Sequence, residues 1–482
     1  MIKPTLLPRR AGYVLTCLLS AAIAACESEV STPVSPLAAP SARATQVAAY
    51  DCAVDQVELP VIECEALVAL YRSTNGASWN HSNGWLERAV PPCRWAGIFC
   101  RGGFVYAIDF FRNNMSGVLP AELGNLTGDF HILRLTGGHV SGAIPAALGN
   151  ARKLEVIWLD QNNITGGIPS SLANLKLADL NLSNNRMTGS IPAWLGSQPL
   201  KNLDLGWNEF SGSIPDELGQ LAELRAMTLG NNKVTGDIPA TLGGMTSAVL
   251  LHLGNNQLTG SIPTTLGSLT NLWYLFLDRN QLSGAIPASL GSLTNLRWLI
   301  LDRNKLSGAV PRWLGGFTNL EYLTLSDNQL SGSIPASLGR LTKAVKLALS
   351  SNLLTGSVPP ELGRMSSLLW LDLEKNQLTG AIPPELGQLT RLFRLNMSEN
   401  SLTGNVPTTL TNLVSLGFFS LRDNRLRGVV PLSVAQFLGG NLDTWGSCYL
   451  NENAGLELGG GPAYRAADQN GDGTICGLAF TR

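Results

Sequence analysis

The chain has 482 residues, of which 44% are hydrophobic and 14% charged, and its formal net charge is −1. A charge so close to zero, with no basic run, gives no electrostatic case for binding nucleic acid. The 51 glycines and 26 prolines follow no three-residue period, which excludes a collagen-like fibre and favours a fold with many short turns.

The first predicted element is an export signal over residues 1–25. Basic residues precede the apolar run 11–25, which is too short for a comfortable membrane span. The junction IAAC, ending at Cys26, resembles the lipobox of bacterial lipoproteins. The resemblance implies lipidation at Cys26 and export to a bacterial cell envelope, whereas an ordinary secretory signal with a chance cysteine is the alternative.

Residues 26–50 are rich in serine, proline and alanine, so they predict a flexible tether. Beyond Cys26 the chain holds six cysteines, gathered near the two ends of the folded part, and an even set of this kind predicts disulfides in an oxidising compartment. Six cysteines allow fifteen pairings. The local pairing is predicted, namely Cys52–Cys64, Cys93–Cys100 and Cys448–Cys476.

An N-terminal cap is predicted over residues 51–103. The segment 59–76 has the pattern of an amphipathic helix that stops at Asn75-Gly76. Trp79 and Trp85 follow, and then the run CRWAGIFC over 93–100. A stack of repeats leaves its ends open, and these residues can close the first end.

One motif recurs from residue 104 to residue 431. The proline of an (I/V/L)-P dipeptide falls in fourteen units at intervals of 23 to 25 residues. A glycine stands three residues before every one of these prolines, and an asparagine stands seven before in all units except the one with Gly138. A period of this length predicts a solenoid instead of separate globular domains.

Each unit follows the pattern LxxLxLxxNxLxGxIPxxLGxL, which resembles the plant-type leucine-rich repeat. The run 93–100 is similar to the C-x-W-x-G-[VI]-x-C sequence of the N-terminal cap in that family. The resemblance implies an α/β repeat fold: a right-handed, curved solenoid of about 14 repeats of 24 residues, with a parallel β-sheet on its concave face and a cap at each end.

The repeat pattern supports the same architecture on physical grounds. The LxL sequence predicts a short strand with two inward side chains, and successive strands stack into a parallel sheet. The asparagine stands where the chain leaves the sheet, so its buried amide can bind turn backbone that is otherwise unpaired. The glycine permits a positive-φ turn, and the Ile-Pro pair begins an extended segment that needs no ladder donor.

The outward side of the predicted sheet carries the candidate binding residues. Large apolar side chains gather there in three consecutive repeats, with acidic and basic residues beside them. The predicted ligand-binding residues are Tyr274, Phe276, Asp278, Arg279, Trp298, Ile300, Asp302, Arg303 and Tyr322. An exposed aromatic patch with a charged rim is typical of a partner-binding surface. Packing of the rings across neighbouring strands, without any ligand, is the alternative.

A C-terminal cap is predicted over residues 432–482, and it contains the sequence DQNGDGTIC at 468–476. This sequence resembles the first half of an EF-hand calcium loop and the short extracellular excalibur motif. The resemblance implies a calcium site at Asp468, Asn470, Asp472 and Thr474. Position twelve is Ala479, so the bidentate acid of an EF-hand is missing, and a cap loop held by Cys476 is the alternative. No required cofactor is predicted.

No catalytic motif stands out, and the chain is predicted not to be an enzyme. The four histidines have no metal-ligand spacing, and HExxH, G-x-S-x-G and phosphate-loop patterns are absent from the sequence. Asp278 and Asp302 lie one repeat apart and could form a carboxylate pair. Each is followed by an arginine, which favours a solvated, ion-paired acid instead.

These features predict a monomeric recognition protein, anchored by lipid, whose concave sheet binds a protein, peptide or glycan. The plant family includes receptor ectodomains and inhibitors of pectinases that degrade cell walls. Two other functions therefore stay open, namely an adhesive or structural surface protein and an inhibitor of secreted hydrolases. Fold alone does not decide between them.

Overall fold

The computed structural model of the chain describes residues 50–441, 448–459, 474–476 and 478–479. These residues belong to one unit, Tyr50–Arg482. The predicted signal, Cys26 and nearly all of the predicted tether lie outside the described residues. Tyr50, predicted to end the tether, is instead buried, and its ring contacts that of Trp95 with 5.2 Å between centroids. Among the described residues, no helix has the length and apolarity to cross a membrane.

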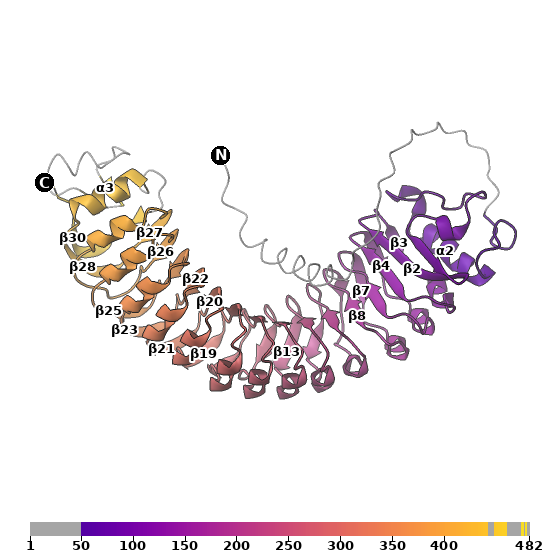
Figure 1. Cartoon of the computed structure of the whole chain (residues 1–482), viewed down its shortest axis with the longest axis horizontal. Coiled ribbons are helices and arrows are strands. Elements are labelled where there is room, and N and C mark those ends of the chain that lie inside the picture. Colours follow the sequence, from indigo (N-terminus) through magenta and orange to yellow (C-terminus); the bar gives the residue numbers. More distant parts are fainter. Residues whose placement is uncertain (1–49, 442–447, 460–473, 477, 480–482) are drawn as a thin grey trace. The chain divides into compact units, whose positions relative to one another are not determined.

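A parallel sheet runs through every repeat and lines the concave face of this unit (Figure 1). In the part of the chain that the structure describes, this main sheet has sixteen strands, of which fourteen come from the repeats. It begins with β1 (Ile98–Arg101), which is antiparallel to β2, and it ends with β29 (Cys448–Tyr449). The repeat strands are β2 (Phe104–Phe111), β4 (Ile132–Thr136), β6 (Val156–Trp158), β8 (Asp179–Asn181), β10 (Asn202–Asp204), β12 (Ala226–Thr228), β14 (Leu250–His252), β16 (Tyr274–Phe276), β18 (Trp298–Ile300), β20 (Tyr322–Thr324), β22 (Lys346–Ala348), β24 (Trp370–Asp372), β26 (Arg394–Asn396) and β27 (Phe418–Ser420).

Shorter strands form a second layer after most of the turns that follow the main-sheet strands. They are β3 (Ser116–Val118), β5 (His139–Gly142), β7 (Asn163–Gly166), β9 (Arg186–Met187), β11 (Ser211–Ser213), β13 (Lys233–Asp237), β15 (Gln257–Thr259), β17 (Ser283–Ala285), β19 (Lys305–Ala309), β21 (Gln329–Ser333), β23 (Leu353–Ser357), β25 (Gln377–Thr379), β28 (Asn424–Val429) and β30 (Asn453–Glu457). The glycine before each Ile-Pro pair has positive φ, for example 69° at Gly260, as its position in the motif predicts. A separate antiparallel pair joins β31 (Thr474–Ile475) to β32 (Leu478–Ala479).

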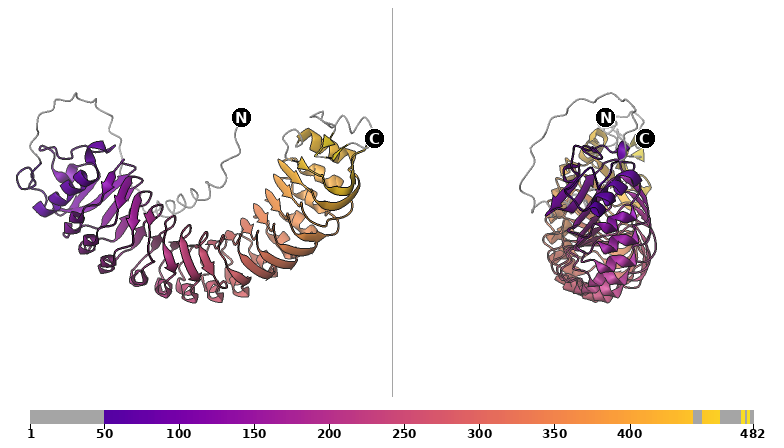
Figure 2. Two further views of the ribbon diagram at one scale, coloured as in Figure 1. Left: turned by 180° about the vertical axis from the view of Figure 1, so that it is seen from behind. Right: turned by 90° about the vertical axis from the view of Figure 1, so that its right-hand side faces the viewer.

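The helical layer of the repeats consists of five-residue 3-10 turns instead of α-helices, which refines the predicted α/β repeat. Seen from behind, these turns line the outer side, opposite the main sheet (Figure 2). Each turn begins directly after the proline, whose own backbone is extended. Only a few residues then remain before the next strand, so the segment forms a short 3-10 turn. They are η4 (Ala121–Asn125), η5 (Ala146–Asn150), η6 (Ser170–Asn174), η7 (Ala193–Ser197), η8 (Asp216–Gln220), η9 (Ala240–Gly244), η10 (Thr264–Ser268), η11 (Ala288–Ser292), η12 (Arg312–Gly316), η13 (Ala336–Arg340), η14 (Pro360–Arg364), η15 (Pro384–Gln388) and η16 (Thr408–Asn412).

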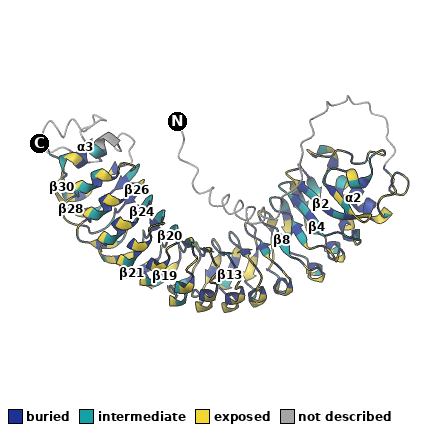
Figure 3. Cartoon of the chain, viewed as in Figure 1, coloured by how far each residue is buried: buried dark blue, intermediate teal, exposed yellow. Residues whose placement is uncertain are grey.

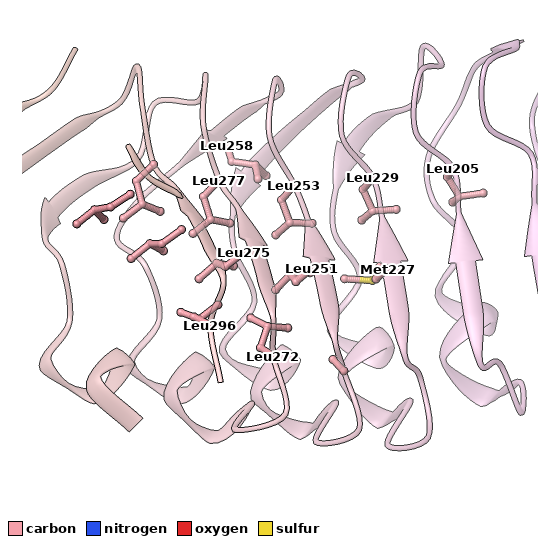
Figure 4. Close-up of a cluster of buried hydrophobic side chains, with 14 of the residues drawn as sticks. Leu205, Met227, Leu229, Leu251, Leu253, Leu258, Leu272, Leu275, Leu277 and Leu296 are labelled. Carbon is pink, nitrogen blue, oxygen red and sulfur yellow. The ribbon is translucent and has the colours of Figure 1, made fainter. Parts of the chain in front are cut away.

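The core lies between the main sheet and the outer turns, and leucines at the same positions fill it in most repeats. Leu272, Leu275 and Leu277 are fully buried, as the alternation of the sequence predicts. Figure 4 shows them beside their counterparts Leu251 and Leu253 of the preceding repeat. Buried and exposed positions recur at the same places along the stack (Figure 3). Each repeat therefore buries its leucines against its neighbours, as a solenoid requires.

A ladder of asparagines holds the turns at the end of the strands. Asn280 donates from Nδ2 to the carbonyls of Leu253, Leu277 and Asp278 at 3.0, 3.2 and 3.2 Å. Its Oδ1 accepts from the backbone N–H of Leu258 at 3.0 Å. The same contacts recur at Asn304, so each amide satisfies backbone groups of its own repeat and of the preceding one.

The N-terminal cap closes the first coil with a helix and a cluster of aromatic rings. Its helix α2 (Val61–Ser73) lies within the predicted segment 59–76, and two 3-10 turns follow, η2 (Gly76–Ser78) and η3 (Pro92–Arg94). The buried Glu63 of α2 accepts hydrogen bonds from the N–H groups of Val105 and Gly128 at 2.9 and 3.0 Å, and its burial raises its pKa. This carboxylate thus joins the cap to backbone that the open end of the stack leaves unpaired.

The six paired cysteines form the predicted disulfides, two in this cap and one at the other end: Cys52–Cys64, Cys93–Cys100 and Cys448–Cys476. At the C-terminal end the helix α3 (Leu432–Asn441) follows the last repeat. The predicted local pairing is therefore confirmed, and both ends of the stack are covalently closed.

Candidate functional site

The main sheet brings the predicted aromatic residues together on its outward side. Tyr274 on β16, Trp298 on β18 and Tyr322 on β20 lie opposite one another in register. Phe276 and Ile300 are likewise in register, two residues further along the same strands. Because neighbouring strands lie about 4.8 Å apart, equivalent side chains on successive repeats are within contact distance.

The rings contact one another edge to face in two pairs and at a tilt in the third, between Trp298 and Tyr322. Their centroids are 5.7 Å apart for Tyr274 and Trp298, 5.9 Å for Phe276 and Trp298, and 4.6 Å for Trp298 and Tyr322. Tyr274 and Phe276 are each only 9% exposed, so the expectation that both are open to solvent is wrong. Trp298, Ile300 and Tyr322 are partly exposed. Cross-strand packing, the alternative explanation, therefore accounts for Tyr274 and Phe276. The accessible apolar surface is formed by Trp298, Ile300 and Tyr322.

Trp273, the residue before β16, adds exposed aromatic surface that the sequence pattern left unassigned. Its side chain is 40% exposed, and the Arg297 guanidinium lies over its ring, 4.4 Å from the centroid. A cation in this position is attracted to the face of the ring. Trp273 and Arg297 thus extend the aromatic surface along the edge of the strands.

Four charged residues were predicted beside the rings: Asp278, Arg279, Asp302 and Arg303. The first two pair with each other, whereas the last two do not. Asp278 lies 3.9 Å from Nε of Arg279, and burial, with the nearby Asp302, raises its pKa to about 6. Arg303 pairs with Asp327 of the next repeat at 3.5 Å instead of with Asp302. Asp302 accepts a hydrogen bond from the Ser326 N–H at 2.7 Å, and burial raises its pKa. The prediction of solvated, locally paired acids is therefore wrong for Asp302, and for Asp278 the pairing with Arg279 holds but the solvation does not.

The aromatic row continues past Tyr322, where the sequence prediction stopped. Lys346 lies over the Trp370 ring at 5.5 Å, and Arg394 lies over the Phe418 ring at 3.9 Å from the centroid. These residues occupy the position that Tyr274 holds on β16. We refer to the following seven residues as the stacking row: Tyr274, Trp298, Tyr322, Lys346, Trp370, Arg394 and Phe418. With six strand spacings, it is about 29 Å long.

A shallow recess of about 380 Å³ lies beside the C-terminal part of the stacking row. It is lined by Leu369, Trp370, Arg391, Phe393 and Ser415. Phe393 is 52% exposed, which is unusual for a phenylalanine in a folded repeat. The sequence prediction missed this region because aromatic and cationic residues alternate there. One feature of the sequence could have revealed it: every residue of the stacking row stands thirteen residues before the proline of its repeat.

The remaining predicted sites lie largely beyond the described residues. Cys26, the first residue of the predicted tether, and Asp468, Asn470 and Asp472 of the predicted calcium loop are not among the residues described. Thr474 is the first residue of β31, whose neighbour Cys476 forms the C-terminal disulfide. Within the described ranges, no group of three or more His, Cys, Asp or Glu side chains has the arrangement of a metal site. Calcium binding stays a prediction.

Comparison with protein families identifies the repeats. Residues 223–282, 284–330 and 294–354 match the family described as Leucine rich repeat. Residues 153–175, 176–198, 199–221, 367–389 and 391–413 match a second family with the same description. The two sets of matches cover repeats from β6 to β26.

Two solved structures resemble the chain over most of its length. One is the plant peptide hormone receptor RGFR1 in complex with RGF2, with 30% identity, a TM-score of 0.60, and coverage of 76% of this chain and 68% of that chain. The other is a leucine-rich repeat protein of Leptospira interrogans, with 33% identity, a TM-score of 0.54, and coverage of 65% of this chain and 77% of that chain.

Curated relatives match over a smaller part of their length. Phytosulfokine receptor 1 of Arabidopsis thaliana is 32% identical over 95 residues, which are 19% of this chain and 9% of the relative. The chain thus spans about a tenth of that protein, and the match concerns the repeats alone.

Proposed function

The chain belongs to the leucine-rich repeat family, and from this we propose that it is an exported recognition protein that binds an extended peptide, or an extended segment of a protein. The ligand lies along the stacking row on the concave side of the main sheet. The similarity to a plant peptide hormone receptor solved in complex with RGF2 supports a peptide as ligand. The three disulfides support export to an oxidising compartment.

The observation that carries the proposal is the concentration of partly exposed aromatic side chains on one part of the sheet. Trp298, Tyr322 and Trp370 occupy outward positions that the repeat fold does not require to be apolar. Large rings with few rotatable bonds provide much contact area at a low entropic cost, and they are enriched in binding hot spots. The sheet holds them rigidly, so little ordering is needed when a ligand binds.

Selection of peptides from a random library tests this proposal although the natural ligand is unidentified. The protein is immobilised, and peptides are selected on it from a random dodecapeptide display library. We expect the Trp298→Ala/Tyr322→Ala double variant to bind the selected peptides at least tenfold more weakly, because two central rings are lost. The matched control is Trp313→Ala, which removes a tryptophan from η12, on the side opposite the main sheet.

Two results would contradict the proposal. One is that the library yields no peptide that binds the protein reproducibly. The other is that the selected peptides bind the Trp298→Ala/Tyr322→Ala variant as tightly as they bind the wild type. Circular dichroism and thermal unfolding of the three proteins establish that any loss of binding is not a loss of folding.

We also propose that Cys26 carries a lipid that anchors the protein in a bacterial envelope. The supporting observation is the lipobox-like junction before Cys26, and several acyl chains together give firm anchoring. Metabolic labelling with a radioactive fatty acid in a bacterial host tests the idea. We expect label in the wild type and none in Cys26→Ser. Label in both proteins, or in neither, would contradict lipidation at this residue.

A further inference from the structure

A group of polar side chains lies next to Phe276 on the outward side of the sheet, beyond the end of the stacking row. We refer to Asp204, Thr228, His252 and Asp278 as the polar cluster. Asp204 on β10 is in register with Thr228 on β12, and Thr228 is in register with His252 on β14. His252 is in register with Phe276, and the two rings contact each other with 5.2 Å between centroids. The cluster therefore adjoins the aromatic surface directly.

Glycines in successive repeats let two members of the cluster lie against the backbone. A Cβ added at Gly230 would collide with the His252 ring. At Gly254, an added Cβ would collide with Oδ1 of Asp278 and would lie 3.3 Å from Nε2 of His252. The imidazole and the carboxylate therefore approach the same point above Gly254. Side chains at these two positions would displace the cluster.

The members of the cluster have few partners of their own. Asp204 accepts a hydrogen bond from the Gly206 N–H at 3.0 Å, and the Ser183 hydroxyl also lies beside its carboxylate, but no cation of the described residues pairs with it. Thr228 is 3% exposed, and its hydroxyl lies beside the Asp204 carboxylate, whose pKa it lowers, but in poor geometry for a hydrogen bond. Neither ring nitrogen of His252 has a hydrogen-bond partner among the described residues. A buried hydroxyl without a well-formed hydrogen bond is costly, and a buried carboxylate without a cation is costlier, so this arrangement has room for a further donor.

The charges of the cluster follow from its burial. Burial raises the pKa of Asp204 to about 6, and burial together with Asp302 raises that of Asp278 to about 6. Burial also lowers the pKa of His252 to about 4. Near pH 7 the cluster thus presents two carboxylates in poor solvation and a neutral imidazole that can accept a hydrogen bond.

We propose that the polar cluster binds a basic side chain, lysine or arginine, of the peptide that lies along the stacking row. This inference rests on the proposed function and specifies its ligand. A lysine ammonium has three N–H donors and a guanidinium has five, which matches the acceptors on Asp204, Thr228 and His252. A cation also reduces the cost of the desolvated Asp204 carboxylate through a charge-assisted hydrogen bond. Asp278, which already lies 3.9 Å from Arg279, adds negative charge beside His252.

The peptides selected on the wild-type protein test this directly. We expect them to share one lysine or arginine at a fixed distance from their apolar residues. Replacing that residue by norleucine or citrulline should weaken binding by about tenfold or more, because the charge is lost and the chain length is kept. The Asp204→Asn/Asp278→Asn double variant should bind the basic and the neutral peptides equally. Asp372→Asn is the matched control, since Asp372 has the repeat position of Asp204 but already pairs with Arg394 at 3.6 Å.

The possible results separate this inference from the proposed function. If the selected peptides depend on Trp298 and Tyr322 but contain no fixed basic residue, the stacking row is the binding site and the inference is overturned. The same conclusion follows if the basic residue is equally important for the Asp204→Asn/Asp278→Asn variant. If no peptide depends on Trp298 and Tyr322, both the function and the inference fail.

Discussion

On the inward side of the main sheet nearly every repeat presents a leucine at the same position, whereas on the outward side the side chains change in character from one strand to the next. Leu275, Leu299 and Leu323 are all fully buried. Their outward neighbours in register are Phe276, Ile300 and Thr324 on the same three strands. The inward positions have to fill a nearly constant space, so they take large apolar side chains, mostly leucine, with Met227 and Phe419 among the exceptions. Outward positions carry no such requirement, and clusters of aromatic or acidic residues there need another explanation.

The strongest test of this contrast is to shorten one side chain on each side of the same strand. We expect Leu299→Ala to lower the free energy of unfolding by about 2–5 kcal/mol, because it leaves a cavity between repeats. Ile300→Ala, next to it on the partly exposed side, should cost less than about 1 kcal/mol. Urea denaturation of the protein, followed by circular dichroism, measures both. Equal losses of stability would mean that Ile300 on the outward side contributes as much to the core as Leu299 does.

A second test removes one amide of the asparagine ladder. Asn304 donates to the carbonyls of Leu277 and Leu301 at 2.9 and 3.1 Å and accepts from the Leu282 N–H at 3.0 Å. We expect Asn304→Ala to lower the free energy of unfolding by about 1–3 kcal/mol, since buried backbone groups lose their partners. Hydrogen exchange should show faster exchange of the Leu282 amide. Unchanged exchange at Leu282 would rule out the bonding role given to the ladder.

The inward side could be predicted almost completely from the sequence, and the outward side only in part. The period of the leucines, asparagines and glycines determines the strands and the turns, because each residue type there has a single physical task. Burial of Tyr274 could not be predicted, since it depends on how neighbouring rings lean on one another. The partner of Arg303 was missed for a similar reason, because a long side chain reaches either strand beside it. Trp370 and Phe418 were missed because cations separate them in the row.

The pH dependence of stability distinguishes the outward acids from ordinary surface carboxylates. The pKa of Asp278 is raised to about 6 from 3.8, so the folded protein binds a proton more tightly than the unfolded chain. The stability associated with this group is therefore present below about pH 4 and is lost as the pH rises through 6. Asp278→Asn should be more stable than the wild type at pH 8, on the order of 1–2 kcal/mol, and equally stable at pH 4.

Thermal or urea unfolding of both proteins between pH 4 and pH 8 checks this expectation. The lowered pKa of His252 has the opposite sign, but it contributes to both proteins and cancels in the difference. A stability difference that did not vary with pH would show that the folded protein does not perturb the Asp278 carboxyl. The same variant is expected to lose affinity for basic peptides, so that stability and binding change in opposite directions.

The smallest expected effect concerns Arg279, which has a positive φ of 53°. Asn231 and Asn255 occupy the same position in earlier repeats, with φ of 59° and 54°, and asparagine tolerates this conformation better than arginine. We expect Arg279→Asn to raise the free energy of unfolding by about 0.5 kcal/mol. If Arg279 contacts the ligand as predicted, the same change should weaken binding of the selected peptides severalfold. A variant that was more stable and bound unchanged would restrict the contact surface to the stacking row and the polar cluster.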